Sequence, residues 1–312
     1  MKRAIAAILL ALTALLCACG QGAPPAATEA ATSAPEETSL TDEKNDDLEW
    51  YEGWYDSEFS PTSDDPMAFC NLFPDPFFAR VVAGVFGKTA TDTTTYEELA
   101  AYDGGIECYP GVLKSIEGIG LLTGLTSFIC YKNDLETLPE EIGNLMNLTE
   151  INLHKAYGLR SLPPEIGQLK KLTSLRVNAT QLEALPKEIG DCEALECLFA
   201  SNTPIISVPP EIGKLKKLRV LTLSGTGITD LPNSLCELTS LEELYLSFTD
   251  LTALPEDIGN LQNLRLLRLF GCKLKTLPRS MRQLKNLRHL NVYDNFELDE
   301  SYKKWFDKKV YS

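Results

Sequence analysis

Histidine is scarce in this sequence of 312 residues, which contains only His154 and His289. The two are far apart along the chain, and neither has a pair of cysteines beside it at the spacing of a metal site. The chain has no glycine-rich loop of the phosphate-cradling kind, and adjacent Glu242 and Glu243 would diverge on a strand instead of facing each other as a catalytic acid pair. We therefore expect no enzyme activity, no metal site and no cofactor.

Basic residues are outnumbered, with 29 Lys and Arg against 44 Asp and Glu and a formal net charge of -15. The acidic excess lies in residues 1–124, which hold 6 basic and 20 acidic side chains, whereas residues 125–312 hold 23 and 24. A nucleic-acid binder needs a basic face to replace the counterions on phosphate. The balance therefore excludes a general nucleic-acid binder, although it is compatible with a local basic patch.

The one long apolar run, Ala4 to Leu16, is too short to span a membrane as a helix. It follows Lys2 and Arg3, as in a secretion signal. The segment Leu16-Cys17-Ala18-Cys19 resembles the lipobox of bacterial lipoproteins, which implies lipidation of Cys19 and anchoring on the extracellular face of the bacterial membrane. The alternative is an ordinary signal peptide with incidental cysteines.

The segment that follows the predicted signal peptide, residues 1–18, lacks an apolar period. Residues 19–48 are rich in Ala, Pro, Thr, Ser and Glu, which predicts a disordered acidic tether. Residues 49–101 begin with clustered rings, at Trp50, Tyr51, Trp54, Tyr55 and Phe59. We favour packing of these rings on the structure that follows, since exposed clustered rings promote aggregation; a ligand-binding segment is the alternative.

From Leu125 onwards the chain repeats eight times with a period of 23 residues, except for one repeat of 24. The template is L-x-x-L-x-L-x-x-[N/T/C]-x-L-x-x-L-P-x-x-I-G-x-L-x-x, and positions below are counted from its first leucine. Residues 241–263, LEELYLSFTDLTALPEDIGNLQN, show it clearly. The pattern resembles the leucine-rich-repeat family, which implies an α/β solenoid: a horseshoe with a parallel concave β-sheet. We expect repeats over residues 102–298.

The ends of such an array need covers, because an end repeat exposes its apolar edge to water. Asp75 with Pro76 predicts one helix start and Thr95 with Glu98 a second, so residues 49–101 contain a helical cap that resembles those of internalin-like surface proteins. Residues 299–312 are expected to form a C-terminal capping helix.

Cysteines form no evident disulfide framework. Seven remain after cleavage of the signal and lipidation of Cys19, and an odd number cannot all pair. We expect free thiols, with Cys70 and Cys108 as the one pair near the cap to test.

Strand residues between the inward leucines are expected to face the concave surface, at the fifth and seventh positions. Most are small or polar, but aromatic and Arg side chains are enriched as in interface cores. These candidate ligand-binding residues are Tyr131, Arg176, Phe199, Tyr245, Arg268, Phe270 and Tyr293. They predict a cell-surface protein–protein interaction module that binds a protein partner on the concave face. The alternative is ordinary surface variation.

A second candidate is a stretch without acids between Asp257 and Asp294. Besides Arg268 it contains a basic collar of Arg265, Lys273, Lys275, Arg279, Arg282, Lys285 and Arg288. Such a collar suits an anionic wall polymer or lipid headgroups, the alternative function. The competing interpretation is that these side chains are ordinary solvated residues or pair with acids of this chain.

Overall fold

The computed structural model describes residues 64–305. These residues all belong to one compact unit, Ser57–Ser312, and the other unit is Met1–Asp56. The predicted signal peptide, lipidated Cys19, tether and aromatic segment at 50–59 lie outside the described residues, as do residues 306–312.

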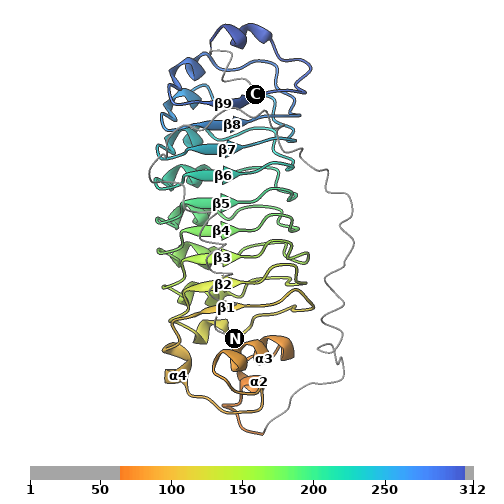
Figure 1. The fold of residues 1–312 in the computed structure, drawn as a ribbon, viewed down its shortest axis with the longest axis vertical. Coiled ribbons are helices and arrows are strands. Elements are labelled where there is room, and N and C mark those ends of the chain that lie inside the picture. Colours follow the sequence, from red (N-terminus) through yellow and green to blue (C-terminus); the bar gives the residue numbers. More distant parts are fainter. Residues whose placement is uncertain (1–63, 306–312) are drawn as a thin grey trace, which may run out of the picture. The chain divides into compact units, whose positions relative to one another are not determined.

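The described chain is a stack of coils in which every coil adds one short strand to a single parallel sheet (Figure 1). Nine strands pair strictly in chain order. They are β1 Gly105–Glu107, β2 Ser127–Ile129, β3 Glu150–Asn152, β4 Ser174–Arg176, β5 Cys197–Phe199, β6 Val220–Thr222, β7 Glu243–Tyr245, β8 Leu266–Arg268 and β9 His289–Asn291. The predicted solenoid is confirmed.

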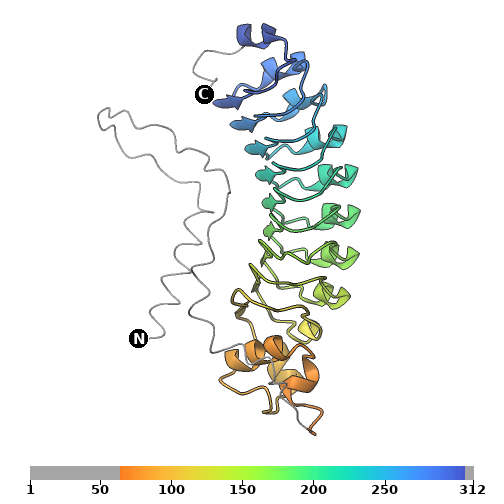
Figure 2. The same ribbon diagram turned by 90° about the vertical axis from the view of Figure 1, so that its right-hand side faces the viewer.

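Opposite the sheet, each coil returns through a short 3-10 helix, and Figure 2 shows strands and 3-10 helices along opposite sides of the stack. These are η1 Ile119–Leu121, η2 Glu140–Asn144, η3 Pro164–Gln168, η4 Lys187–Asp191, η5 Pro210–Lys214, η6 Asn233–Glu237, η7 Ile258–Asn260, η8 Arg279–Gln283 and η9 Glu300–Lys304. A proline precedes most of them, since its fixed φ suits the turn and its missing N–H donates nothing there.

Glycine in these 3-10 helices allows neighbouring coils to approach closely. A Cβ on Gly167 of η3 would lie 2.7 Å from the carbonyl oxygen of Glu188 in η4, and one on Gly213 of η5 would lie 2.5 Å from that of Ser234 in η6. In the repeated Ile-Gly pair, the isoleucine side chain fills the core and the glycine allows the close spacing between coils.

Apolar residues, most of them leucine, at the first, fourth, sixth, eleventh and fourteenth positions point into the coil and form one continuous core. A single coil cannot bury them alone, so stability comes from stacking. Phe128 replaces the fourth-position leucine of β2 and meets Phe78 edge-on, with 6.4 Å between ring centroids. The core thereby continues from the repeats into the N-terminal cap.

The N-terminal cap consists of α2 Phe69–Leu72, α3 Pro76–Val85 and α4 Tyr96–Ala100. As predicted, Asp75 starts α3: its Oδ1 accepts hydrogen bonds from the backbone N–H groups of Phe77 (2.9 Å) and Phe78 (3.0 Å). Its Oδ2 accepts two more, from the N–H groups of Lys114 and Ser115 at 3.2 and 3.3 Å. One carboxylate thus caps the helix and joins it to the first coil.

The predicted capping box at α4 is only half formed. Thr95 Oγ1 accepts from the N–H of Glu98 at 3.1 Å, as expected. The Glu98 carboxylate does not return to Thr95; it accepts from Lys88 Nζ at 2.6 Å and from Thr94 Oγ1 at 2.9 Å. The Glu98 carboxylate bonds to the Lys88 ammonium instead of the Thr95 backbone N–H because a charge-assisted hydrogen bond is stronger.

At the C-terminal end, Asp299 starts the expected capping helix, with its Oδ1 accepting from the N–H of Ser301 at 2.9 Å. The described turn, η9, is a 3-10 helix and not an α-helix. Tyr302 is its buried residue and covers part of the last coil.

No disulfide forms among the seven cysteines of residues 64–305, which are Cys70, Cys108, Cys130, Cys192, Cys197, Cys236 and Cys272. Cys108 does not pair with Cys70: its thiol hydrogen-bonds with that of Cys130 on the adjacent coil, which together with burial raises the pKa of Cys108 well above its usual value. Burial also raises the pKa of Cys192 to about 12. These thiols act as small core side chains.

Candidate functional site

The exposed face of the sheet carries three columns of side chains, one more than the sequence analysis identified. In each strand the middle residue is buried, and in most strands both outer residues reach the surface. The third position therefore faces outwards with the fifth. Its residues are Ser127, Glu150, Ser174, Cys197, Val220, Glu243, Leu266 and His289. The two-residue period of a strand was sufficient to identify this column.

Arg176 and Phe199 form one cluster on this face. They are direct neighbours across β4 and β5, and the Arg176 guanidinium lies 4.4 Å from the centroid of the Phe199 ring. Arg176 Nε also lies 3.9 Å from Glu150 Oε1 on β3. The cation is held between a carboxylate and a ring, so its position is fixed before any partner arrives.

Tyr245 and Arg268 form a second pair, again as direct neighbours, across β7 and β8. The Arg268 guanidinium lies 5.6 Å from the Tyr245 ring centroid. The Tyr245 hydroxyl donates to Glu243 Oε2 at 2.8 Å. The third-position Glu243 thus orients a ring that the sequence had already marked as a candidate.

Phe248 is a functional candidate that the sequence analysis missed. It occupies the eighth position with a left-handed backbone, φ 57°, and its side chain is 55% exposed. Other coils place Gly225 and Gly271, or short or flexible side chains, at this position. A bulky ring is rare at positive φ and costs free energy there. No sequence period predicts this, because the conformation belongs to the bend.

Phe248 belongs to an aromatic ridge, defined as Tyr245, Phe248, Phe270 and Tyr293. The rings of Phe248 and Phe270 meet edge-on with centroids 5.0 Å apart. Backbone hydrogen bonds join the three coils, from Phe248 N–H to the Phe270 carbonyl and from Gly271 N–H to the Tyr293 carbonyl, at 2.7 and 2.9 Å. Tyr293 is 60% exposed. The ridge therefore presents apolar surface on three successive coils.

The structure thus divides the predicted concave residues. Arg176 and Phe199 form one cluster, and Arg268 contacts Tyr245 of the aromatic ridge. Tyr131 lies on the coil of β2, separated from Arg176 by the coil of β3. Within the two predicted columns, the aromatic and Arg side chains thus gather in separate clusters.

His154 lies between Tyr131 and Asn178 on the seventh-position column and is half-buried. Its Nδ1 is 3.1 Å from the Asn178 carbonyl oxygen and 2.6 Å from the Asn178 side-chain amide nitrogen. Burial, followed by the charges of Lys155, Lys132 and Arg176, lowers the pKa of His154, although the hydrogen bond with Asn178 acts in the opposite direction. Over residues 64–305, no group of three or more His, Cys, Asp and Glu side chains is placed to hold a metal ion.

The residues of the basic collar fall into two groups, according to whether they form ion pairs with acids of this chain. Three of its members pair with acids: Arg265 with Glu242 at 2.8 Å, Lys273 with Asp250 at 2.6 Å and Lys275 with Glu297 at 3.4 Å. The remaining four are Arg279, Arg282, Lys285 and Arg288. Exposed pairs of this kind contribute little to stability, but they do neutralise the field of the collar.

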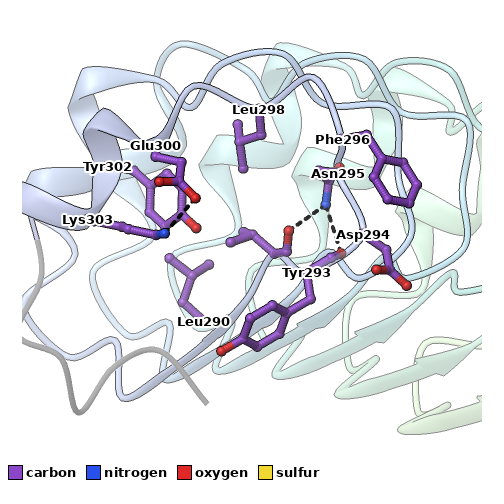
Figure 3. Close-up of a pocket in the computed structure, with 10 residues that line it drawn as sticks. Leu290, Tyr293, Asp294, Asn295, Phe296, Leu298, Glu300, Tyr302 and Lys303 are labelled. Carbon is purple, nitrogen blue, oxygen red and sulfur yellow. Dashed lines mark hydrogen bonds and ion pairs between the residues drawn. The ribbon is translucent and has the colours of Figure 1, made fainter.

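A cavity of about 490 Å³ lies between the coil of β9 and η9. Figure 3 shows Leu290, Leu298 and Tyr302 around it, with the Tyr293 ring of the aromatic ridge at its border. Lys303 Nζ donates to Glu300 Oε1 at 2.6 Å, and Asn295 Nδ2 donates to the Val292 carbonyl at 2.9 Å. Some of the polar groups here are thus already bonded within the chain, and the cavity lies at the end of the stacked core.

None of the described helices has the length and apolar character needed to cross a bilayer.

Comparisons with known proteins agree with this architecture. The model of the leucine-rich-repeat family, in its two-copy form, matches residues 216–256. Internalin J of Listeria monocytogenes serotype 4b (strain F2365) is 40% identical over 72 residues, which are 23% of this chain and 8% of that protein. The fold is therefore a leucine-rich-repeat solenoid, and its sequence relatives include an internalin.

Solved structures extend the similarity over more of the chain. A leucine-rich-repeat protein of Leptospira interrogans is 32% identical with a TM-score of 0.54, over 64% of this chain and 56% of that one. A plant peptide hormone receptor, RGFR1 in complex with RGF2, is 27% identical with a TM-score of 0.53, over 62% of this chain and 33% of that one. The chain thus matches less than two thirds of the length of each of these proteins.

Proposed function

We propose that this chain is a protein-binding module whose partner contacts the aromatic ridge and Arg268 on the exposed face of the sheet. The observation that carries the proposal is Phe248, a bulky ring held at φ 57° and more than half exposed. Five other coils also place a non-glycine residue at positive φ in this bend, so what sets Phe248 apart is a large exposed ring at a position where such a ring costs free energy. Costs of this kind are common at functional sites.

The chemistry of the ridge supports a protein partner. Tyr and Arg are enriched among the residues that dominate binding free energy, especially when they cluster in a preorganised patch. Arg268 against Tyr245, and Phe248 against Phe270, are already in contact without a partner. A partner therefore needs to immobilise little side-chain freedom on this surface. The similar plant receptor, solved in complex with RGF2, is a precedent for recognition by such a repeat fold.

We further propose that the module acts at the outer surface of a bacterial cell, anchored by lipid on Cys19. Support comes from the apolar segment at residues 4–16 and the Leu16-Cys17-Ala18-Cys19 motif. Lipid on Cys19 and a following tether of polar residues would keep the ridge close to the membrane.

A double substitution tests the protein-binding proposal. Tyr245→Ala with Arg268→Ala should abolish capture of a partner by crosslinking from the surface of cells that make this protein. The matched control is Asn152→Ala with Thr222→Ala, which changes two fifth-position residues outside both clusters. Thermal unfolding should be similar for both. Equal capture by the two double variants would refute the proposal.

A further inference from the structure

A cavity of about 450 Å³ lies between η8 and η9, on a different part of the molecule from the aromatic ridge. Its lining consists of Arg279, Arg282, Ser301, Lys304 and Trp305. Three of these five side chains are cations, and none is an acid. Its volume is within the range of roughly 300–1,000 Å³ that is usual for small-ligand sites.

Arg282 lies where the other coils carry a small residue. The nineteenth position is Gly in five coils and Cys236 in another, since the following 3-10 helix leaves little room there. The coil that follows η8 returns through η9 instead of a proline-led helix, and the long side chain of Arg282 lies against the end of that turn. The Arg282 guanidinium lies 4.9 Å from the centroid of the Trp305 ring. One wall of the cavity is therefore a cation stacked on an aromatic ring.

The 3-10 helix η8 also carries basic side chains where most other coils carry acids. Acids occupy the sixteenth or seventeenth position in most coils, as in Glu141, Glu165 and Glu188, whereas η8 has Arg279 and Ser280. No ion pair joins Arg279, Arg282 or Lys304 to an acid among residues 64–305.

Within residues 64–305, the acids nearest in sequence to the cavity already have partners. Glu300 accepts from Lys303 Nζ at 2.6 Å. Asp299 Oδ1 accepts from the backbone N–H of Ser301 at 2.9 Å. Neither of these two acids pairs with a cation of the cavity, so the three cations present a positive field to a ligand.

We propose that this cavity binds a phosphodiester that carries a small polyol, such as a glycerol phosphodiester. Two guanidinium groups suit phosphate oxygens, since their planar donors pair with them in a bidentate manner, and Lys304 adds a point charge. The Ser301 hydroxyl is a donor for a further oxygen. The Trp305 ring offers an apolar wall to the C–H groups of the polyol. This site does not depend on the protein-binding proposal, because it shares no residue with the ridge.

Calorimetric titration of the full chain with glycerophosphoglycerol tests the site. Arg279→Gln with Lys304→Gln should weaken binding by roughly tenfold or more, because each charge-assisted hydrogen bond that is lost is worth about that factor. Lys187→Gln with Lys217→Gln removes the same charge from central coils and should leave binding unchanged. The single variant Arg279→Glu, which leaves the Arg282–Trp305 contact intact, should also lose binding while its thermal unfolding stays like that of the natural chain.

Two further probes distinguish the source of the phosphate. Dihexanoyl-phosphatidylglycerol below its micelle concentration should bind more tightly than glycerophosphoglycerol if the ligand is a lipid headgroup. Equal affinities would indicate a soluble or polymeric diester, and inorganic phosphate should bind more weakly than either. Absence of binding by the natural chain, equal losses in the cavity and control variants, or equal affinity for inorganic phosphate would each overturn the proposal.

Discussion

Phe248 packs edge-on against Phe270 with 5.0 Å between ring centroids, on a backbone held at φ 57°. The neighbouring coil makes room for it, since a Cβ on Gly271 would come within 3.0 Å of Phe248 Cδ1. The left-handed backbone of Phe248 and the absent side chain of Gly271 thus belong to one arrangement. It places an exposed ring where most coils have none.

Replacing Phe248 separates binding from stability. Phe248→Gly relieves a strained backbone but removes the contact with Phe270, two effects of about 1 kcal/mol each with opposite sign. We expect a free energy of unfolding within about 1 kcal/mol of the natural value, measured by urea denaturation. Partner affinity should fall by roughly tenfold or more. Unchanged affinity would remove Phe248 from the binding surface.

Asp75→Ala should loosen the N-terminal cap. The substitution removes four hydrogen bonds, two within α3 and two to the first coil. We expect the free energy of unfolding to fall by about 1–3 kcal/mol. Hydrogen exchange should accelerate first in α3. Asp134→Ala, at an exposed bend, is the control, and a similar loss in both variants would contradict this role for Asp75.

Two glycines should respond to the same substitution with opposite sign. Gly167→Ala adds a Cβ 2.7 Å from the Glu188 carbonyl oxygen and should lower the free energy of unfolding by about 1–3 kcal/mol. Gly84 lies inside α3, where an added Cβ would have nothing within 4 Å, so Gly84→Ala should raise it by about 0.5–1 kcal/mol. Urea denaturation measures both. Equal effects would mean that glycine does not set the spacing of the coils.

The thiol of Cys192 should resist alkylation. Burial raises its pKa to about 12, and its Sγ donates to the Ile166 carbonyl oxygen at 3.2 Å. Because a raised pKa keeps the thiol protonated, about one molecule in ten thousand carries the thiolate at pH 8. Iodoacetamide at pH 8 should therefore modify the partly exposed Cys70 first and reach Cys192 only after unfolding, as followed by mass spectrometry. Comparable rates at both sites in the folded chain would be inconsistent with this burial.

Cys19→Ser should release the protein from membranes into the medium, because one thioether-linked anchor would hold it there. Fractionation followed by immunoblotting measures the change. Cys17→Ser is the control and should leave the protein in the membrane fraction. Retention of the Cys19→Ser chain in membranes would contradict lipid anchoring.

The sequence by itself determined the repeating architecture. A period of 23 residues, apolar residues alternating within each strand and proline before most return segments are local signals. They predict strands, turns and a shared core because each depends on residues close together in the chain. The same locality explains why Asp75 with Pro76 correctly predicted the start of α3.

Only the tertiary structure decided which side chains meet across coils. Such neighbours are about 23 residues apart, and their contacts depend on side-chain rotamers and on the backbone of the bends. The sequence therefore did not predict that part of the basic collar pairs with acids or that Arg282 lies against Trp305. The exposed position of Phe248 likewise depends on the left-handed backbone of its bend, which the 23-residue period does not predict.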